Sequence, residues 1–233
     1  MCGRFASYFE AQELAEFFQV THVTAAAPPS WNVAPAQPIS VVRAIPGTTA
    51  AGGAPPAREL FTARWGLVGA WAKDPSIGPK PINARSETVT TKPMFRAAAR
   101  TRRALIPAAG YYEWTPTPGA GKTPYYLHPE PEGQPIALAG LYEDWRGEGT
   151  EILLTTATII TRPATDTLGQ IHDRMPVVVP PEFWADWLDP ELERPAQVQQ
   201  LLDALPAPQL YPRQVGRAVG SVMSNGPSLI QPA

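Results

Sequence analysis

Cys2, which directly follows the initiator Met1, is the only cysteine among the 233 residues of the chain. Cysteine is small enough for Met1 to be removed before it, so we expect the mature chain to begin at Cys2 with a free α-amine beside the thiol. Such a 1,2-aminothiol condenses with an aldehyde to a Schiff base, and its thiol can then close a five-membered thiazolidine ring. Judged by position alone, the alternative is a small buried hydrophobic residue without a chemical role.

Three further polar segments occur where strands or loops would ordinarily be apolar or unremarkable. They are Asn83–Thr88, the single carboxylate Glu113 within the aromatic run Tyr111–Trp114, and His172-Asp173-Arg174 ahead of an apolar run. These residue types supply an acid, a base and an anion clamp to a nucleophile. Each also has a structural interpretation, namely a helix cap, an outward-pointing carboxylate and a loop histidine with satisfied hydrogen bonds.

Bulk composition excludes several classes of protein. With 44% hydrophobic residues and seven Trp, the chain can build a substantial core, and we expect one domain over residues 1–233. One cysteine cannot form an internal disulfide, and the three histidines lack zinc-site spacing, so neither a metal nor a cofactor is expected. The sequence contains no run of about 18 apolar residues and no signal peptide, which predicts a soluble, cytoplasmic protein without a membrane partner.

Charge is unevenly distributed along the chain, although the net charge is only −2. The segment 85–103 is rich in Arg and contains one acid, whereas 182–193 contains five acids and no base. Arginine binds phosphate in a bidentate manner, so the first segment is a candidate nucleic-acid surface. Codon usage in a GC-rich genome would produce the same excess of arginine.

The elements that must position these residues are mostly short strands. Apolar or alternating runs predict strands at 39–44, 60–67, 105–107, 111–114, 125–128, 136–142, 152–161 and 176–179. A capping box at Ser7–Glu10 predicts a helix over about 8–19, and further helical patterns cover about 94–102, 181–188 and 195–205. Prolines and glycines predict loops at 24–38 and 47–56 and a hairpin turn at 115–121. Repeated βαβ units are excluded, and we expect an α+β fold whose core is a mostly antiparallel or mixed sheet, open and barrel-like, with peripheral helices.

Six motifs in a fixed order make the chain resemble the SRAP family, the SOS response-associated peptidase-like proteins. The motifs are Met1–Phe5, Asn32–Pro35, Arg64–Leu67 with Trp71, Asn83–Thr88, Ala104–Trp114 and Ile171–Pro176. The similarity extends from Cys2 to about Asn225. It implies a protein that shields abasic sites in single-stranded DNA by covalent attachment, as a monomer associated with the nucleoid when bound to DNA.

The resemblance also implies a role for individual residues. Cys2 would form the thiazolidine with the ring-opened deoxyribose, Asn83 would hold the N-terminus and the sugar remnant, and Glu113 with His172 would move protons. Glu113 would in addition assist self-removal of Met1. Trp71 would act as a stacking wedge. The remaining DNA contacts implied by the family pattern are Arg4, Asn32, Pro35, Arg85 and Arg174.

Three hypotheses remain distinct at this point. The first is covalent linkage to abasic DNA, in which ring closure by the thiol diverts a Schiff base that would otherwise cleave the strand as a lyase does. The second is a peptidase or amidohydrolase with an N-terminal cysteine nucleophile. The third is a single-stranded DNA-binding module in which Cys2 is merely buried. Loss of the thiol separates the first hypothesis from the third.

Overall fold

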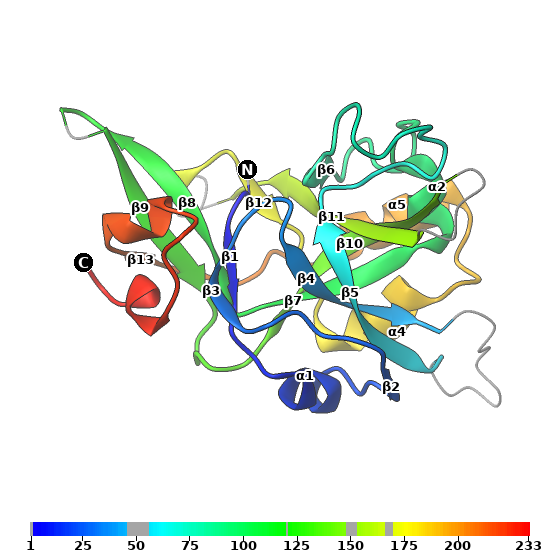
Figure 1. The fold of residues 1–233 in the computed structure, drawn as a ribbon, viewed down its shortest axis with the longest axis horizontal. Coiled ribbons are helices and arrows are strands. Elements are labelled where there is room, and N and C mark those ends of the chain that lie inside the picture. The colour runs from blue at the N-terminus through cyan, green and yellow to red at the C-terminus, as the bar shows by residue number, and fades with distance from the viewer. Residues whose placement is uncertain (1, 46–55, 120, 148–152, 166–169) are drawn as a thin grey trace.

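The computed structural model describes residues 2–45, 56–119, 121–147, 153–165 and 170–233 (Figure 1). Met1, nearly all of the predicted 47–56 loop, residue 120 of the predicted turn and the first residue of the predicted 152–161 strand lie outside these ranges. Two β-sheets form the body of the molecule, and short helices lie on its periphery. The predicted α+β class is confirmed.

One sheet closes into a five-stranded barrel. Its members are β4 (Pro38–Ala44), β5 (Arg58–Trp65), β7 (Arg103–Ala108), β10 (Ile136–Arg146) and β11 (Leu153–Pro163). They pair in the order β11, β10, β7, β4, β5, and a parallel pairing of β5 with β11 at Arg64 and Thr156 completes the ring. The sheet is therefore more closed than the open barrel predicted from sequence. Three short strands extend it: β2 (His22–Val23), β6 (Asn83–Arg85) and β12 (Arg174–Pro176).

The second sheet is antiparallel and stands beside the barrel. Its order is β13 (Tyr211–Gln214), β9 (Gly121–His128), β8 (Gly110–Thr117), β1 (Phe5–Ser7) and β3 (Ser30–Val33). Only Ala109 separates β7 of the barrel from β8 of this sheet, so one continuous segment connects the two. At the junction a Cβ on Gly110 would lie 2.5 Å from the carbonyl oxygen of Leu127, and glycine is therefore required there.

Strands of the barrel are buried on both faces, which explains their continuous apolar runs. In β7, Ala104 and Ile106 pack in one cluster inside the barrel, whereas the intervening Leu105 packs in a second cluster outside it. The inner cluster also contains Cys2, Phe5 and Trp65. The N-terminal residues thus form part of the barrel core.

The α-helices with bounds in the described ranges lie on the periphery: α1 (Ala11–Phe17), α2 (Arg96–Thr101), α4 (Trp184–Leu188) and α5 (Pro195–Ala204). Each falls within a predicted helical segment, with shorter bounds. The capping box was predicted at the wrong residues, because Ser7 ends β1 and Glu10 is the N-cap. The backbone N–H of Glu10 donates to the Glu13 carboxylate over 2.7 Å, which completes the box.

Several strands were missed in the sequence. β3 lies within the proline-rich segment predicted as a loop, and β6 coincides with the polar run that begins at Asn83. The strand predicted at 176–179 is shifted: β12 ends at Pro176, and only an isolated bridge from Leu138 to Val178 continues it. These strands are short and depend on pairing with distant segments rather than on local pattern.

Candidate functional site

Cys2 lies in the inner cluster of the barrel with no exposed surface. Burial raises the pKa of its thiol well above the ordinary value, and the charge of Glu113 acts in the same direction. The charge of the amino terminus and a hydrogen bond from the backbone of Arg4 oppose this shift. At neutral pH the thiol is therefore protonated, and a reaction at sulfur needs a group that accepts its proton.

Asn83 holds the backbone of Cys2 by a hydrogen bond. It begins β6, which pairs in parallel with β11, so that Asn83 lies opposite Ile159. Its Nδ2 donates to the carbonyl oxygen of Cys2 over 2.9 Å. Its Oδ1 is buried and accepts no hydrogen bond within the described part of the chain. A buried amide oxygen of this kind is suited to receive a hydrogen bond from a bound ligand.

Glu113 is buried in β8, between β1 and β9, with 4% of its surface exposed. Burial raises the pKa of the carboxyl, whereas the charges of the amino terminus and His172 act in the opposite direction. Tyr111 lies two residues before Glu113 on the same face of β8. Burial and the charges of Cys2 and Glu113 raise the pKa of Tyr111. Tyr111 thus belongs to the same cluster, although the sequence offered no reason to separate it from other core aromatics.

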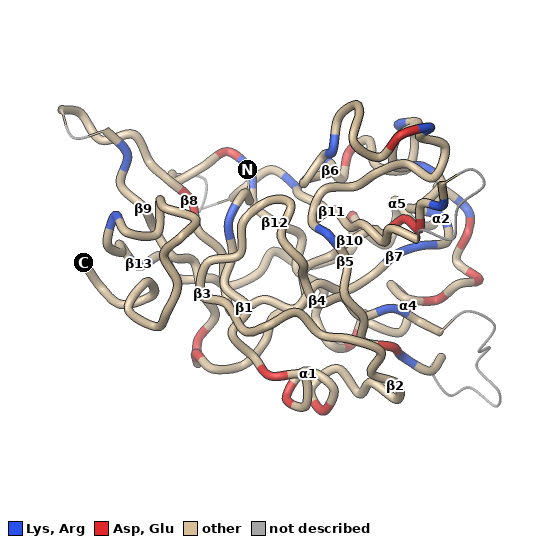
Figure 2. The backbone as a smooth tube through the Cα atoms, in the orientation of Figure 1, with Lys and Arg blue, Asp and Glu red and all other residues tan. Residues whose placement is uncertain are grey.

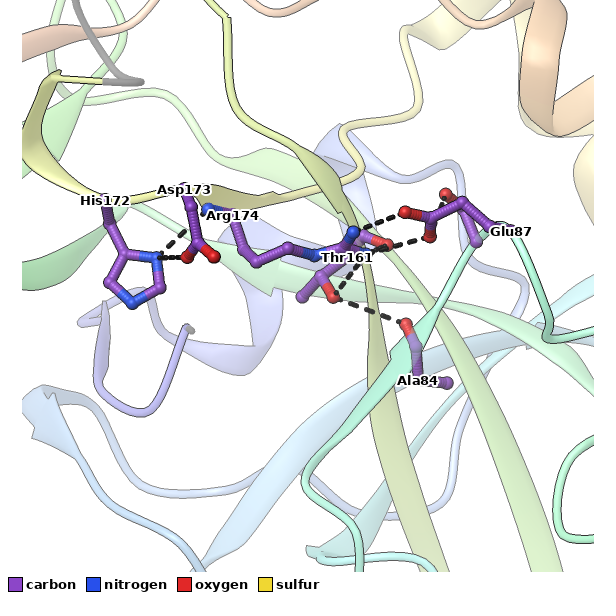
Figure 3. Close-up of polar contacts among 7 residues, drawn as sticks. Ala84, Glu87, Thr161, His172, Asp173 and Arg174 are labelled. Atoms are coloured by element: carbon purple, nitrogen blue, oxygen red, sulfur yellow. Dashed lines mark hydrogen bonds and ion pairs between the residues drawn. The ribbon is translucent and has the colours of Figure 1, made fainter.

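His172 lies in the connection between β11 and β12 (Figure 3). Its Nδ1 is 3.0 Å from the backbone nitrogen of Arg174 and 2.8 Å from Oδ1 of Asp173. One nitrogen cannot accept and donate at the same time. In the neutral ring Nδ1 accepts the Arg174 N–H, which leaves the proton on Nε2, and in the imidazolium Nδ1–H donates to Asp173.

Arg174 is bound within the protein rather than free to bind phosphate. Its guanidinium donates to both carboxylate oxygens of Glu87 and, over 2.6 Å, to the carbonyl oxygen of Thr161 (Figure 3). Its side chain is only 10% exposed. The hydrogen bond from Arg174 lowers the pKa of Glu87 to about 2. The Arg174 guanidinium, which was predicted to contact phosphate, is therefore already neutralised by Glu87.

Arg85 has the opposite character, although it ends β6 only two residues before Glu87, the carboxylate that binds Arg174. Its side chain is exposed, and no acidic group pairs with it in the ranges that the structure describes. Its backbone pairs with Thr161 of β11, which fixes the base of the side chain. Arg85 is thus an anchored cation available to an anionic ligand.

Arg4 and Asn32, both predicted to contact DNA, link β3 and the residue before β1 to the C-terminal segment. Nη1 of Arg4 donates to Oδ1 of Asn32 over 2.8 Å and to the carbonyl oxygen of Val219 over 2.9 Å. Nδ2 of Asn32 donates to the carbonyl oxygens of Ser221 and Ser224 over 2.9 and 2.7 Å. Asn32 is 2% exposed. These contacts use the polar groups of Asn32 to stabilise the fold.

Trp71 is 68% exposed and lies in the segment between β5 and β6. With Ile77 and Met94 it lines a mainly apolar cavity of about 250 Å³. A Cβ on Gly69 would lie 2.6 Å from the indole nitrogen, so glycine allows the ring to approach the backbone. Pro35 is exposed in the turn between β3 and β4. Both positions are accessible to a ligand.

The basic and acidic segments seen in the sequence partly neutralise each other. Arg100 forms an ion pair of 3.3 Å with Glu193, and the buried Arg103 donates to the carbonyl oxygens of Trp187 and Asp189. Basic positions nevertheless remain beside β6 and α2, whereas acidic positions mark α1 (Figure 2). The predicted phosphate surface is therefore smaller than the segment 85–103 suggested.

Neither a metal site nor a membrane span is indicated by the described residues. No group of three or more His, Cys, Asp or Glu side chains among them is arranged to hold a metal ion. None of the helices described has the length and apolar character needed to cross a bilayer.

Comparison with known proteins gives consistent matches. Residues 1–222 match the family model for SOS response associated peptidase (SRAP). The abasic site processing protein YoqW of Bacillus subtilis is 37% identical over 234 residues, covering 99% of both chains. The abasic site processing protein YedK of Escherichia coli is 35% identical over 173 residues, covering 72% of each chain. A crystal structure from Bacteroides thetaiotaomicron has the same fold, with a TM-score of 0.78 at 23% identity over both full chains.

The family match covers Cys2, Asn83, Glu113 and His172, and relatives with more than 35% identity extend over almost the whole chain. The order of motifs, the fold and the alignments agree. The chain therefore belongs to the SOS response associated peptidase (SRAP) family.

Proposed function

We propose that this protein processes abasic sites in single-stranded DNA by covalent attachment through Cys2. One observation carries the proposal: the only cysteine of the chain lies at its second position, with its carbonyl held by Asn83 and its thiol under the influence of the Glu113 charge. The names of the YoqW and YedK relatives support the same substrate.

Before the reaction with DNA, hydrolysis of the Met1–Cys2 peptide bond releases methionine and frees the α-amine of Cys2. This amine attacks the C1′ aldehyde of the ring-opened deoxyribose and loses water to form an imine. The thiol then adds to the imine carbon, so that a carbon–sulfur bond forms and the thiol proton passes to the nitrogen. The product is a thiazolidine, and water is the only molecule released.

Proton transfer is the part of this reaction that the side chains of the site assist. Since the thiol is protonated at neutral pH, ring closure requires a base, and the Glu113 carboxylate is the acceptor we assign. In its neutral form His172 carries its proton on Nε2, from which it can donate to the sugar oxygen during ring opening. The free Oδ1 of Asn83 would accept a hydrogen bond from the sugar remnant.

Ring closure also decides the fate of the DNA strand. While the imine persists, the 2′ protons of the sugar are acidic, and loss of one leads to β-elimination and strand cleavage. Addition of the thiol removes the imine and stops this path. We therefore include a lyase side activity in the proposal, limited by how fast Cys2 closes the ring.

The direct test is intact-mass spectrometry of purified protein before and after incubation with an abasic oligonucleotide. We expect a chain that lacks Met1, and then a species heavier by the oligonucleotide minus one water. The same oligonucleotide with a tetrahydrofuran analogue, which has no aldehyde, is the control and should add nothing. A protein that gains no mass from the abasic oligonucleotide would refute the covalent mechanism.

Arg85→Ala is expected to weaken binding to single-stranded DNA. Because each phosphate contact on a single strand contributes about 0.7 to the slope of log affinity against log salt, that slope should fall by about this amount. Fluorescence anisotropy with the tetrahydrofuran oligonucleotide at several salt concentrations measures both effects. Arg194→Ala removes another exposed arginine, at the start of α5, and should change neither. Equal slopes for wild type and Arg85→Ala would remove Arg85 from the interface.

A further inference from the structure

Thr115 connects the strand that carries Glu113 with the segment that carries His172. It lies on β8 two residues after Glu113, and because side chains alternate along a strand, the two share a face. Its Oγ1 donates to the carbonyl oxygen of Ile171 over 3.3 Å. Ile171 directly precedes His172. One hydroxyl thus bonds the strand that carries Glu113 to the residue that precedes His172.

The two segments joined by this bond differ in how they are held. β8 is paired continuously with β9, where Glu113 lies opposite Tyr125 and Thr115 opposite Thr123. His172, by contrast, belongs to a connection between strands. The position of Glu113 is therefore fixed by the sheet, whereas that of His172 depends on individual contacts.

The other contacts of this connection lead toward the barrel. The N–H of Ala164 donates to the carbonyl oxygen of Asp173 over 2.9 Å, and Arg174 is bound to Thr161 and Glu87 (Figure 3). None of these partners belongs to β8. The hydrogen bond from Thr115 Oγ1 to the carbonyl oxygen of Ile171 joins this connection to β8.

We propose that Thr115 is a positioning residue, whose hydroxyl sets the placement of the His172 imidazole relative to the Glu113 carboxylate. The inference rests on the proposed function, since it matters for activity only if both residues move protons. Displacement of a reacting group by about 1 Å can cost about 100-fold in rate, so the loss of a single hydrogen bond can have a visible effect. Thr115 itself touches neither the aldehyde nor Cys2 in this mechanism.

Three variants test the proposal. Thr115→Val keeps the shape and removes the hydroxyl, Thr115→Ser keeps the hydroxyl, and Thr117→Val is the matched control. Thr117 lies on the same strand, and its hydroxyl bonds to that of Thr123 over 2.6 Å and to the carbonyl oxygen of Thr115 over 3.5 Å, so this control shows what loss of a hydroxyl bond within the β8–β9 hairpin does by itself. We expect Thr115→Val to form the adduct about 10-fold more slowly, with unchanged affinity for the tetrahydrofuran oligonucleotide. Thr115→Ser and Thr117→Val should remain within about 2-fold of wild type.

A second measurement does not depend on DNA. The backbone N–H of Arg174 donates to His172, so its hydrogen exchange, followed by NMR, reports how firmly the imidazole is held. We expect faster exchange in Thr115→Val than in Thr115→Ser or Thr117→Val. Equal exchange in all of these would overturn the inference, as would a Thr115→Ser variant as slow in adduct formation as Thr115→Val. If wild type forms no adduct, the proposed function fails, whereas the exchange result still decides the role of Thr115.

Discussion

Cys2→Ala protein that lacks Met1 is expected to form no stable adduct with abasic single-stranded DNA. The variant keeps the α-amine and can still form the imine, but it has no sulfur to close the ring. The imine then persists, and we expect more strand cleavage by β-elimination than with wild type. Denaturing gels of a labelled abasic oligonucleotide measure adduct and cleavage together, and borohydride reduction traps the imine.

The design of this experiment separates the covalent mechanism from a non-covalent DNA-binding module. Mass spectrometry first confirms that Met1 is absent, because a retained Met1 would by itself keep the Cys2 α-amine from reacting. Cys2→Ser controls for shape, since it keeps a small polar group in the same buried place. If Cys2→Ala gave as much heat-stable adduct as wild type, the thiazolidine mechanism would be wrong. If neither protein formed an adduct or an imine, a non-covalent DNA-binding module would be the better description.

Glu113→Gln is expected to slow adduct formation by about 100- to 10,000-fold, the range typical of a lost general acid or base. The glutamine fits the same buried place in β8 but cannot take the thiol proton. Quenched time courses with the abasic oligonucleotide give the rate. Because the substitution leaves Arg85 untouched, affinity for the tetrahydrofuran oligonucleotide should stay close to that of wild type.

Glu113→Gln is also expected to affect stability: it lowers the rate of adduct formation but should not lower the free energy of unfolding at neutral pH. Burial raises the pKa of Glu113, so the folded protein binds this proton more tightly than the unfolded chain does. The free energy of unfolding therefore falls as the pH rises from the ordinary glutamate pKa of 4.5 through the raised pKa of the folded state. Above that folded-state pKa the destabilisation by the buried charge is complete. Glutamine carries no such cost. We expect Glu113→Gln to be at least as stable as wild type at pH about 7, and the difference to shrink toward pH about 4, in urea unfolding.

Glu143→Gln is the matched control for both effects. Glu143 is also 4% exposed, but it forms an ion pair of 2.8 Å with Arg102 and lies outside the site. Removal of its charge leaves Arg102 without its partner and should lower stability while the adduct rate stays near that of wild type. A Glu113→Gln variant with the wild-type rate would exclude Glu113 as the base.

The sequence predicted the α+β class of the fold but not that one sheet closes into a barrel. Strands such as β7 and β10 were visible because they are apolar on both faces. The parallel pairing of β5 with β11 was not, since it joins Arg64 to Thr156 across a large part of the chain. β3 was hidden by surrounding prolines, and its pairing with β1 is what makes it a strand.

Prediction of the site was limited in the same way. The placement of Cys2, Glu113 and His172 in the sequence marked them as candidates, and the family resemblance supplied their expected roles. The structure joins Asn83 to Cys2 by a hydrogen bond. The roles of the arginines could not be predicted, because they depend on partners far along the chain. Arg174 is neutralised by Glu87, whereas Arg85, only two residues from that carboxylate, remains exposed.

The contacts of Arg4 and Asn32 with the C-terminal segment have a consequence for biosynthesis. β1 follows the proposed reactive end of the chain, and its neighbour Arg4 donates to Val219 as well as to Asn32. Asn32 likewise binds carbonyls at Ser221 and Ser224. The surroundings of Arg4 are therefore complete only after a residue 215 positions later, Val219, has been synthesised. In the proposed mechanism, a chain truncated before this segment would carry its aminothiol without the contacts that hold β3 and the start of β1 in place.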